Sequence, residues 1–130
     1  MKRIRVLARS VCAAALLAVA TIAGAGEVAY TPAAFEHALA AGVPTVVHFR
    51  ASWCPTCKVQ KPIVDALLND PKRKDLTLLA ADYDTETALK QRLRVVQQST
   101  FIVFKGGKEV ARSTGETRKE AIAALFDKAL

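Results

Sequence analysis

The chain has 130 residues, of which 52% are hydrophobic and 24% are charged, and its formal net charge is +7 at pH 7. Its Lys and Arg residues form no dense stripe with interleaved aromatic side chains, which argues against nucleic acid as a partner. Four of the 19 basic residues lie within the first nine positions, so the rest of the chain has a charge balance of only +3. That remainder is long enough for one compact domain, which we expect to be a monomer.

The N-terminus has the three-part order of a secretory signal peptide. Residues 1–9 are basic, residues 11–23 are almost wholly apolar, and Ala23-Gly24-Ala25 supplies the small residues of a cleavage site. We therefore expect a signal peptide over 1–25, a mature domain over 26–130 and a periplasmic location, or membrane anchoring if the leader stays uncleaved. Cys12 would leave with the leader, so the mature chain would keep two cysteines in a compartment where disulfides persist.

Hydrophobic patterns and turn residues in the mature chain predict strands that alternate with helices. A strand precedes a helix that begins at Thr31-Pro32 and stops at Gly42. A buried strand over 45–49 comes next, followed by a helix that runs from the cysteines to about residue 69 and contains Pro62. A second buried strand over 76–81 precedes a short helix over 87–93. The chain then forms a hairpin of strands over 101–104 and 109–111 around Gly106-Gly107, and it ends in a helix with Ile122, Leu125 and Phe126 on its apolar face. This order predicts an α/β fold, with a mixed sheet and helices on both faces.

Two cysteines lie where a strand gives way to a helix, in the sequence Trp53-Cys54-Pro55-Thr56-Cys57-Lys58. Cysteines three residues apart at the start of a helix lie on adjacent turns and can form one disulfide. The first would lie at the helix N-terminus, where free backbone N–H groups and the helix dipole favour a thiolate. Cys54 is therefore the expected nucleophile, and Cys57 can resolve the mixed disulfide that Cys54 forms.

Two other uses of this cysteine pair remain open. A structural zinc site usually needs four ligands, whereas the mature chain has no second cysteine pair, and its two histidines, His37 and His48, have no partner at ligand spacing. A purely structural disulfide would close too small a loop to stabilise the fold much. Redox chemistry is the favoured interpretation, and we assign no metal ligand and no cofactor.

From about residue 27 to residue 130 the chain resembles the thioredoxin superfamily. The match rests on the run 46–58, on Pro62 five residues after Cys57, on the hairpin turn over 104–108, and on Gly115. The resemblance implies a thioredoxin fold with a five-stranded mixed sheet, Cys54 as the attacking thiol and Cys57 as the resolving thiol. It also implies protein thiols and disulfides as partners, and it leaves room for a membrane electron donor.

Three departures from the family pattern affect the site. Pro55-Thr56 stands between the cysteines where ordinary thioredoxins have Gly-Pro. A similar dipeptide occurs in some periplasmic thioredoxin-like reductases. Because the dipeptide tunes the redox potential, the direction of electron flow stays open. His48 replaces a buried acid of the family, and the usual lysine partner of that acid falls at Ala80. Ser99 replaces a cis-proline, in a loop Gln98-Ser99-Thr100 that pairs with substrate in the family.

These departures carry expectations of their own. We expect His48 to point inward beneath the cysteines, either as a base for the Cys57 proton or as a core histidine held by a backbone hydrogen bond. The Gln98–Ser99 bond should be trans, since a cis bond before a non-proline residue costs about 2.5–4 kcal/mol. The Ser99 hydroxyl could then contact the Cys54 thiolate, and the opened space would loosen substrate pairing and tolerate a metal. On this basis Ser99→Pro should raise exchange activity.

Three further features flank the site. Trp53 is expected either to shield its side or to be an ordinary part-buried aromatic residue, and Lys58 either to stabilise the thiolate or to be merely solvated. Asp82-Tyr83-Asp84 is expected to be a solvated patch at the end of a strand. Together the sequence predicts a periplasmic thiol–disulfide oxidoreductase of the reductase or exchange type. The alternative is a non-enzymatic module that holds a metal or a partner protein through the cysteine pair.

Overall fold

A computed structural model describes residues 26–130, so the predicted signal peptide over 1–25 and Cys12 lie outside the described residues. The elements, in chain order, are β1 (Gly26–Ala29), α1 (Pro32–Ala41), β2 (Thr45–Arg50), α2 (Pro55–Leu68), a short 3₁₀ helix η1 (Pro71–Arg73), β3 (Thr77–Asp82), α3 (Thr87–Leu93), β4 (Thr100–Lys105), β5 (Lys108–Thr114) and α4 (Lys119–Asp127). The predicted order of strands and helices is confirmed, and η1 is the one added element. Over these residues no helix has the length and apolar character needed to cross a membrane.

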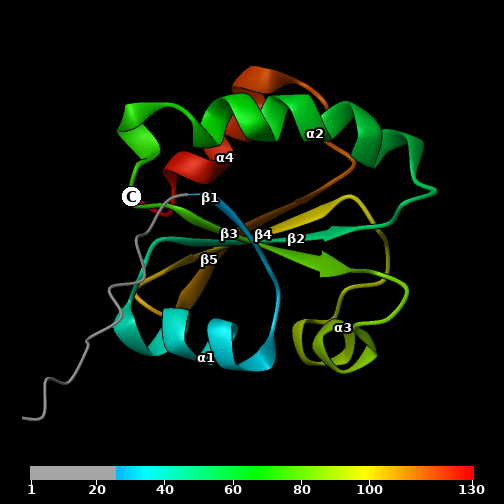
Figure 1. Ribbon diagram of the computed structural model, residues 1–130, viewed down its shortest axis with the longest axis horizontal. Helices are drawn as coiled ribbons and strands as arrows, with labels where there is room; N and C mark the ends of the chain where they lie inside the picture. The colour runs from blue at the N-terminus through cyan, green and yellow to red at the C-terminus, as the bar shows by residue number, and fades with distance from the viewer. Residues whose placement is uncertain (1–25) are drawn as a thin grey trace, which may run out of the picture.

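The five strands form one mixed sheet in the order β1-β3-β2-β4-β5. Strands β1, β3 and β2 run parallel, whereas β4 is antiparallel to β2 and β5 is antiparallel to β4 (Figure 1). The last pair is a hairpin closed by Gly106-Gly107, whose φ angles of 56° and 78° are those that a two-residue hairpin turn requires. The predicted α/β fold with a five-stranded mixed sheet is therefore confirmed.

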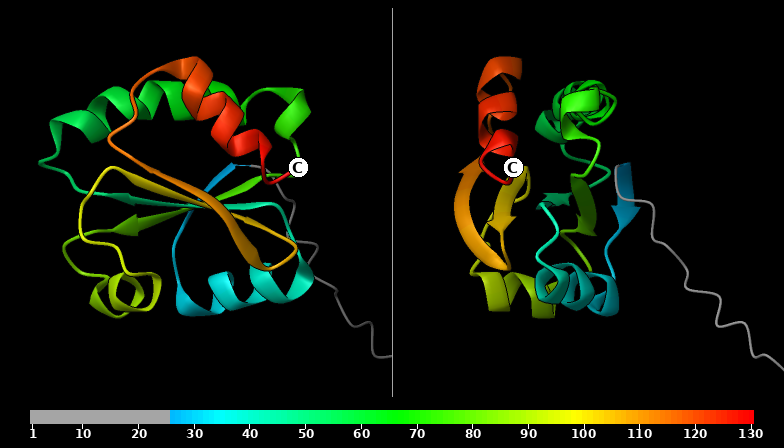
Figure 2. Two further views of the ribbon diagram at one scale, coloured as in Figure 1. Left: turned by 180° about the vertical axis from the view of Figure 1, so that it is seen from behind. Right: turned by 90° about the vertical axis from the view of Figure 1, so that its left-hand side faces the viewer.

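Helices cover both faces of the sheet, with α2 and α4 on one face and α1 and α3 on the other (Figures 1 and 2). The core on the α2 and α4 side contains Val46, Val64, Leu67, Leu76, Leu78, Phe101, Val103, Ile122, Leu125, Phe126 and Ala129. The core on the α1 and α3 side contains Phe35, Val47, Phe49, Leu79, Ala81, Leu89, Val95, Ile102 and Phe104. Because side chains alternate along a strand, β2 supplies residues to both cores, and it is buried from Thr45 to Phe49, as its apolar sequence predicts.

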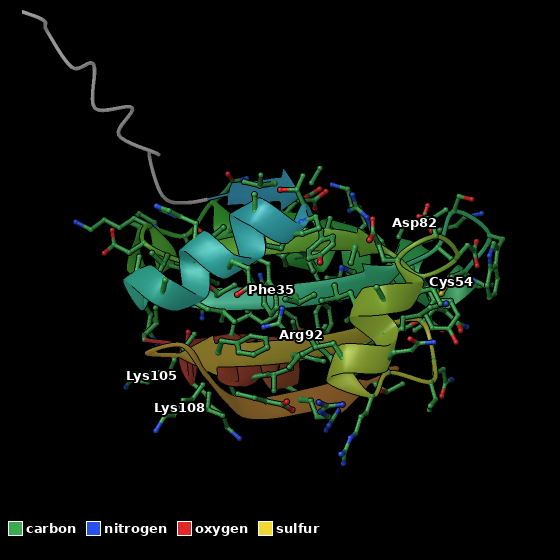
Figure 3. All side chains as sticks on the ribbon, turned by 90° about the horizontal axis from the view of Figure 1, so that it is seen from below. Phe35, Cys54, Asp82, Arg92, Lys105 and Lys108 are labelled. Carbon is green, nitrogen blue, oxygen red and sulfur yellow. The ribbon has the colours of Figure 1, made fainter. Side chains whose placement is uncertain are left out.

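The topology brings the ends of the two central parallel strands to one edge of the sheet. Arg50 at the end of β2 pairs in register with Asp82 at the end of β3. The chain then turns from β2 into α2, which places Cys54 at this edge near Asp82 and far from the hairpin that carries Lys105 and Lys108 (Figure 3). In open α/β sheets this edge, outside the carboxyl ends of the strands, is the usual place for a functional site.

Candidate active site

Cys54 caps the N-terminus of α2. Its backbone is extended, with φ −81° and ψ 113°, and Pro55 follows as the first helical residue, where its missing N–H costs nothing. The sulfur of Cys54 accepts a hydrogen bond from the backbone N–H of Cys57 at 3.1 Å. Both thiols are reduced and buried, and no part of Cys54 is exposed. The expected arrangement of the pair, with Cys54 at the helix start and Cys57 one turn further in, is confirmed.

The surroundings of the two sulfurs push their pKa values in opposite directions. Burial opposes ionisation of Cys54, but hydrogen bonds from the Cys57 thiol, the Ser99 hydroxyl and the backbone N–H groups of Cys57 and Thr56 outweigh it and lower the pKa of the Cys54 thiol. Burial and the hydrogen bond to Cys54 raise the pKa of the Cys57 thiol. A pair of this kind holds its negative charge on Cys54 and its proton on Cys57.

Ser99 lies beside both sulfurs. Its Oγ is 3.1 Å from the sulfur of Cys54 and 3.3 Å from the sulfur of Cys57, which confirms the expected contact of the hydroxyl with Cys54. The Gln98–Ser99 bond is trans, as predicted, because none of the described peptide bonds is cis. Ser99 has φ 62°, a left-handed conformation that few residues other than glycine adopt. The departure from the family pattern therefore changes both the backbone and the chemistry beside the sulfurs.

Gln60, which the sequence analysis does not single out, joins this loop to the helix. It lies on the buried face of α2, one turn beyond Cys57, and is completely buried. Its Nε2 donates to the backbone carbonyl of Ser99 at 3.3 Å and to that of Glu116 at 2.9 Å. A pattern in the sequence could have found it, because Cys57, Gln60, Val64 and Leu67 follow helical spacing on one apolar stripe. A glutamine on such a stripe needs buried partners.

His48 points to the same face of the sheet as the cysteine-bearing helix, as predicted, and is buried. Its Nε2 lies 2.9 Å from Oε1 of Gln60, and its ring stacks on Phe101 with centroids 4.2 Å apart. The Nε2 protons of Gln60 go to carbonyls, so its Oε1 accepts and His48 carries its proton on Nε2. Nδ1 of His48 is then an unprotonated, buried atom without a partner among the described residues.

Burial lowers the pKa of His48 to about 4, and the hydrogen bond to Gln60 offsets this only in part. His48 is therefore neutral at pH 7. Of the two expected roles, the structure favours a core histidine, since such a weak base takes up the proton of a thiol poorly. The expected backbone hydrogen bond is wrong in detail, because a side chain from α2 holds the ring instead. Ala80, in the place of the family lysine, pairs with His48 across β2 and β3.

The segment Asp82-Tyr83-Asp84 does more than form a solvated patch, which corrects the sequence-based expectation. Oδ2 of Asp84 accepts a hydrogen bond from Nε1 of Trp53 at 2.8 Å and so holds that indole at the side of the site, although Trp53 stays 54% exposed. Tyr83 packs against the cluster formed by Ala51 and the two cysteines, and its hydroxyl donates to the backbone carbonyl of Val96 at 2.9 Å. These contacts join residues that are 31 and 13 positions apart, which local patterns do not reveal.

The remaining predicted residues are placed as follows. Pro55 and Thr56 form the first turn of α2, and Lys58 lies on its exposed side, beside a shallow pocket of about 240 Å³ that also touches Cys57. Gln98 is half-buried in the loop before β4, and Thr100 begins β4, where its Oγ1 donates to the carbonyl of Gln97 at 2.8 Å. The structure thus brings Ser99 and His48 near α2 and leaves Lys58 in solvent.

The donors around the sulfurs do not amount to a complete metal site within one chain. Over residues 26–130 the side chains form no cluster of three or more His, Cys, Asp or Glu residues that could hold a metal ion. What the arrangement offers is a nucleophilic thiolate at a helix N-terminus, a second thiol one turn further along the helix, and a hydroxyl that touches both sulfurs. These are the functional groups that thiol–disulfide exchange requires.

Comparisons with known proteins agree with the fold and the chemistry. The family model described as Thioredoxin matches residues 27–128. The structure of Trxlp from Edwardsiella tarda is similar with a TM-score of 0.76 and 40% identity, covering 78% of this chain and 98% of that one. A thioredoxin of Staphylococcus aureus is 37% identical over 101 residues, which are 77% of this chain and 94% of that protein.

A longer protein shares the same region. The bifunctional thioredoxin reductase/thioredoxin of Mycobacterium leprae is 33% identical over 88 residues, which are 68% of this chain and 19% of that protein. The family model spans nearly all of residues 26–130, and it covers the cysteine pair, the sheet and the helices described above. The chain therefore belongs to the thioredoxin family and is a thiol–disulfide oxidoreductase.

Proposed function

We propose that the protein is exported to the periplasm and there reduces or exchanges disulfides of other proteins through Cys54 and Cys57. The observation that carries this proposal is the position of the Cys54 sulfur at the N-terminus of α2, where it accepts the N–H of Cys57 at 3.1 Å. That hydrogen bond, the helix dipole and the Ser99 hydroxyl favour a thiolate at Cys54. Cys57 keeps its proton until it is needed, because its pKa is raised by burial.

The reaction proceeds in two displacements. The Cys54 thiolate attacks one sulfur of a substrate disulfide, a mixed disulfide forms, and the other substrate sulfur leaves as a thiolate that takes a proton from water. Cys57 then loses its proton to solvent and attacks the sulfur of Cys54, which forms the Cys54–Cys57 disulfide and releases the second substrate thiolate. Two electrons have passed to the substrate, and a dithiol donor has to return them; a membrane-bound donor fits a periplasmic site.

Export is supported by the order of basic, apolar and small residues in the first 25 positions. Mass spectrometry of protein from the periplasmic fraction of a bacterial host should give a mature chain that begins at Gly26. Recovery of the full-length chain in the membrane fraction would replace this proposal with an anchored domain that faces the periplasm. We further propose that the mature protein acts as a monomer, which its sedimentation behaviour would test.

The direction of electron flow is the main point that an experiment has to fix. The protein should be equilibrated with mixtures of reduced and oxidised glutathione, and the fraction with a Cys54–Cys57 disulfide should be measured by alkylation and mass spectrometry. A reduction potential below that of glutathione supports the reductase assignment, and a potential well above it would make the protein an oxidant. Absence of any reversible disulfide would exclude both.

A second candidate is a non-enzymatic module that holds a metal through the cysteines. The observation in its favour is the trans bond at Ser99, which places a small polar side chain beside the sulfurs in the place of a proline ring. Two sulfurs and one hydroxyl leave a four-coordinate ion short of a ligand, so a second molecule would have to supply one. Metal content of protein purified without an affinity tag, compared with turnover of a model disulfide, separates the two candidates.

A further inference from the structure

The two displacements described above make no use of Ser99 in the second step, although its hydroxyl reaches both sulfurs. We propose that Ser99 is a third catalytic residue, whose hydroxyl donates a hydrogen bond first to the Cys54 thiolate and then to Cys57 as that thiol ionises. This inference rests on the proposed exchange function and deepens it. It assigns to one buried side chain the stabilisation of negative charge in both halves of the reaction.

The geometry allows one hydroxyl to serve both sulfurs. Oγ of Ser99 lies 3.1 Å from the sulfur of Cys54 and 3.3 Å from that of Cys57, so the two distances are nearly equal. A hydroxyl has one proton to donate and two lone pairs to accept, and its proton changes direction by rotation about the Cβ–Oγ bond alone. Before the reaction it can donate to the Cys54 thiolate, to which the Cys57 thiol also donates.

Burial strengthens the hydrogen bond from Ser99 to the Cys54 thiolate. Ser99 is 2% exposed and Cys54 is completely buried, so in the resting state no bulk water surrounds the charge on that sulfur. The thiolate depends on fixed donors, which are the N–H groups of Cys57 and Thr56, the thiol of Cys57 and the hydroxyl of Ser99. Hydrogen bonds to a charged group in such surroundings are stronger than those in water.

The switch follows from the change of charge during the reaction. Once Cys54 has attacked, its sulfur belongs to a neutral disulfide and is a weak acceptor, so the Ser99 proton is free to turn toward Cys57. Cys57 gives its proton to solvent, and its sulfur attacks that of Cys54. The electron pair of the bond between Cys54 and the substrate leaves with the substrate sulfur, which takes a proton from water. Ser99 keeps its own proton throughout.

Other groups near the sulfurs are not placed for this task. The Nε2 proton of His48 is committed to Gln60, and its Nδ1 carries no proton to donate. Lys58 lies on the exposed side of α2, where solvent screens its charge. Among the charged and polar side chains considered above, Ser99 alone combines burial with contact to both sulfurs.

Gln60 and the strand hairpin hold Ser99 in position. The carbonyl of Ser99 accepts the N–H of Gly115 at 3.0 Å and the Nε2 proton of Gln60 at 3.3 Å. The next residue, Thr100, is tied to Gln97 and to Thr114 through its hydroxyl. These bonds keep a serine in the left-handed conformation at φ 62°, which would otherwise cost free energy. Gln60 is thus a positioning residue for Ser99.

The test compares two variants that both remove the hydroxyl but differ in backbone strain. Ser99→Ala lacks the hydroxyl and keeps the strained conformation, whereas Ser99→Gly lacks the hydroxyl and adopts φ 62° without strain. Reduced protein is mixed with dithiobis(nitrobenzoate). The first equivalent of coloured thionitrobenzoate reports attack by Cys54, and the second reports resolution by Cys57. Thermal unfolding of both variants checks that they are folded.

Both variants should slow each release by about tenfold to 100-fold, the usual effect of losing a hydrogen bond to a charged group. Both should also raise the pKa of Cys54 by about one unit, measured from the pH dependence of its alkylation by iodoacetamide. Ser52→Ala, which removes an exposed hydroxyl near Cys54, should change neither quantity.

Wild-type rates and an unchanged pKa in the glycine variant would overturn the proposal, since a defect confined to the alanine variant would come from backbone strain. Slowing of the first release alone would overturn the switch. Failure of the proposed function looks different, because the wild-type protein itself would then release no second equivalent of thionitrobenzoate. Gln60→Leu should slow both releases, and loss of the Ser99 effect in the Gln60→Leu background would support the positioning role of Gln60.

Discussion

Nε2 of His48 on β2 and Oε1 of Gln60 on α2 lie 2.9 Å apart and form a buried hydrogen bond behind the cysteines. Because Gln60 also binds the carbonyls of Ser99 and Glu116, one glutamine joins the central strand to the loops before β4 and after β5. The polar groups beside the sulfurs are thus fixed to the core of the sheet.

The buried, neutral state of His48 predicts a pH dependence of stability. Its pKa in the folded protein is about 4, below its ordinary value of 6.5, so the unfolded chain binds the extra proton between these two values. The contribution of neutral His48 is complete above pH 6.5 and is lost as the pH falls toward 4. We expect the free energy of unfolding to fall by about 3 kcal/mol through this group over that range.

Denaturant unfolding of wild-type protein and of His48→Gln between pH 4 and pH 7 measures this effect. The glutamine variant can still donate to Gln60 but does not titrate, so its stability should fall less steeply than that of the wild type. His37→Gln removes the exposed histidine on α1 and should leave the slope nearly unchanged. Equal slopes for all three proteins would show that His48 is not held neutral.

The two cysteines should have different roles in exchange. Cys54→Ser should abolish reaction with a disulfide substrate, because it removes the sulfur at the helix N-terminus. Cys57→Ser should still react once and should accumulate a mixed disulfide with the substrate through Cys54, visible by non-reducing electrophoresis and mass spectrometry. Faster alkylation of Cys57 than of Cys54 at mildly acidic pH would reverse these assignments.

Tyr83 should control access to the buried nucleophile. It packs against the cluster of Ala51, Cys54 and Cys57, and its hydroxyl donates to the carbonyl of Val96. Tyr83→Ala removes this cover and should raise the rate of Cys54 alkylation at a fixed pH above the pKa of Cys54 by several-fold, because the reagent reaches the sulfur more often. Tyr83→Phe keeps the ring and should stay close to the wild-type rate. If both variants alkylated at the wild-type rate, the ring would not limit access.

Ser99→Pro should destabilise the protein. Proline fixes φ near −65°, whereas Ser99 has φ 62°, so the turn would have to rebuild to accept the ring. We expect a loss of more than about 1 kcal/mol in the free energy of unfolding, measured by urea denaturation. This conflict revises the sequence-based expectation that the substitution would simply raise exchange activity. Ser99→Gly, which suits the positive φ, should be at least as stable as the wild type.

The sequence by itself determined the elements of this fold and the place of its cysteines. Helix caps, apolar periodicity and the Gly106-Gly107 turn are local features, and each depends on residues within one or two turns of the chain. The same holds for Cys54 and Cys57, whose spacing and position after a buried strand predict a nucleophile at a helix N-terminus. Those predictions needed no knowledge of how the elements pack.

Only the tertiary structure decided what surrounds the sulfurs. Cys54 and Ser99 are 45 positions apart, Gln60 and Ser99 are 39 apart, and Trp53 and Asp84 are 31 apart. Whether such residues meet depends on the register of β4 on β2 and on the packing of α2 against the sheet. Local sequence patterns reveal neither. The partner of His48 and the left-handed backbone of Ser99 arise from the same packing, because buried polar groups accept whichever donors the assembled core brings to them.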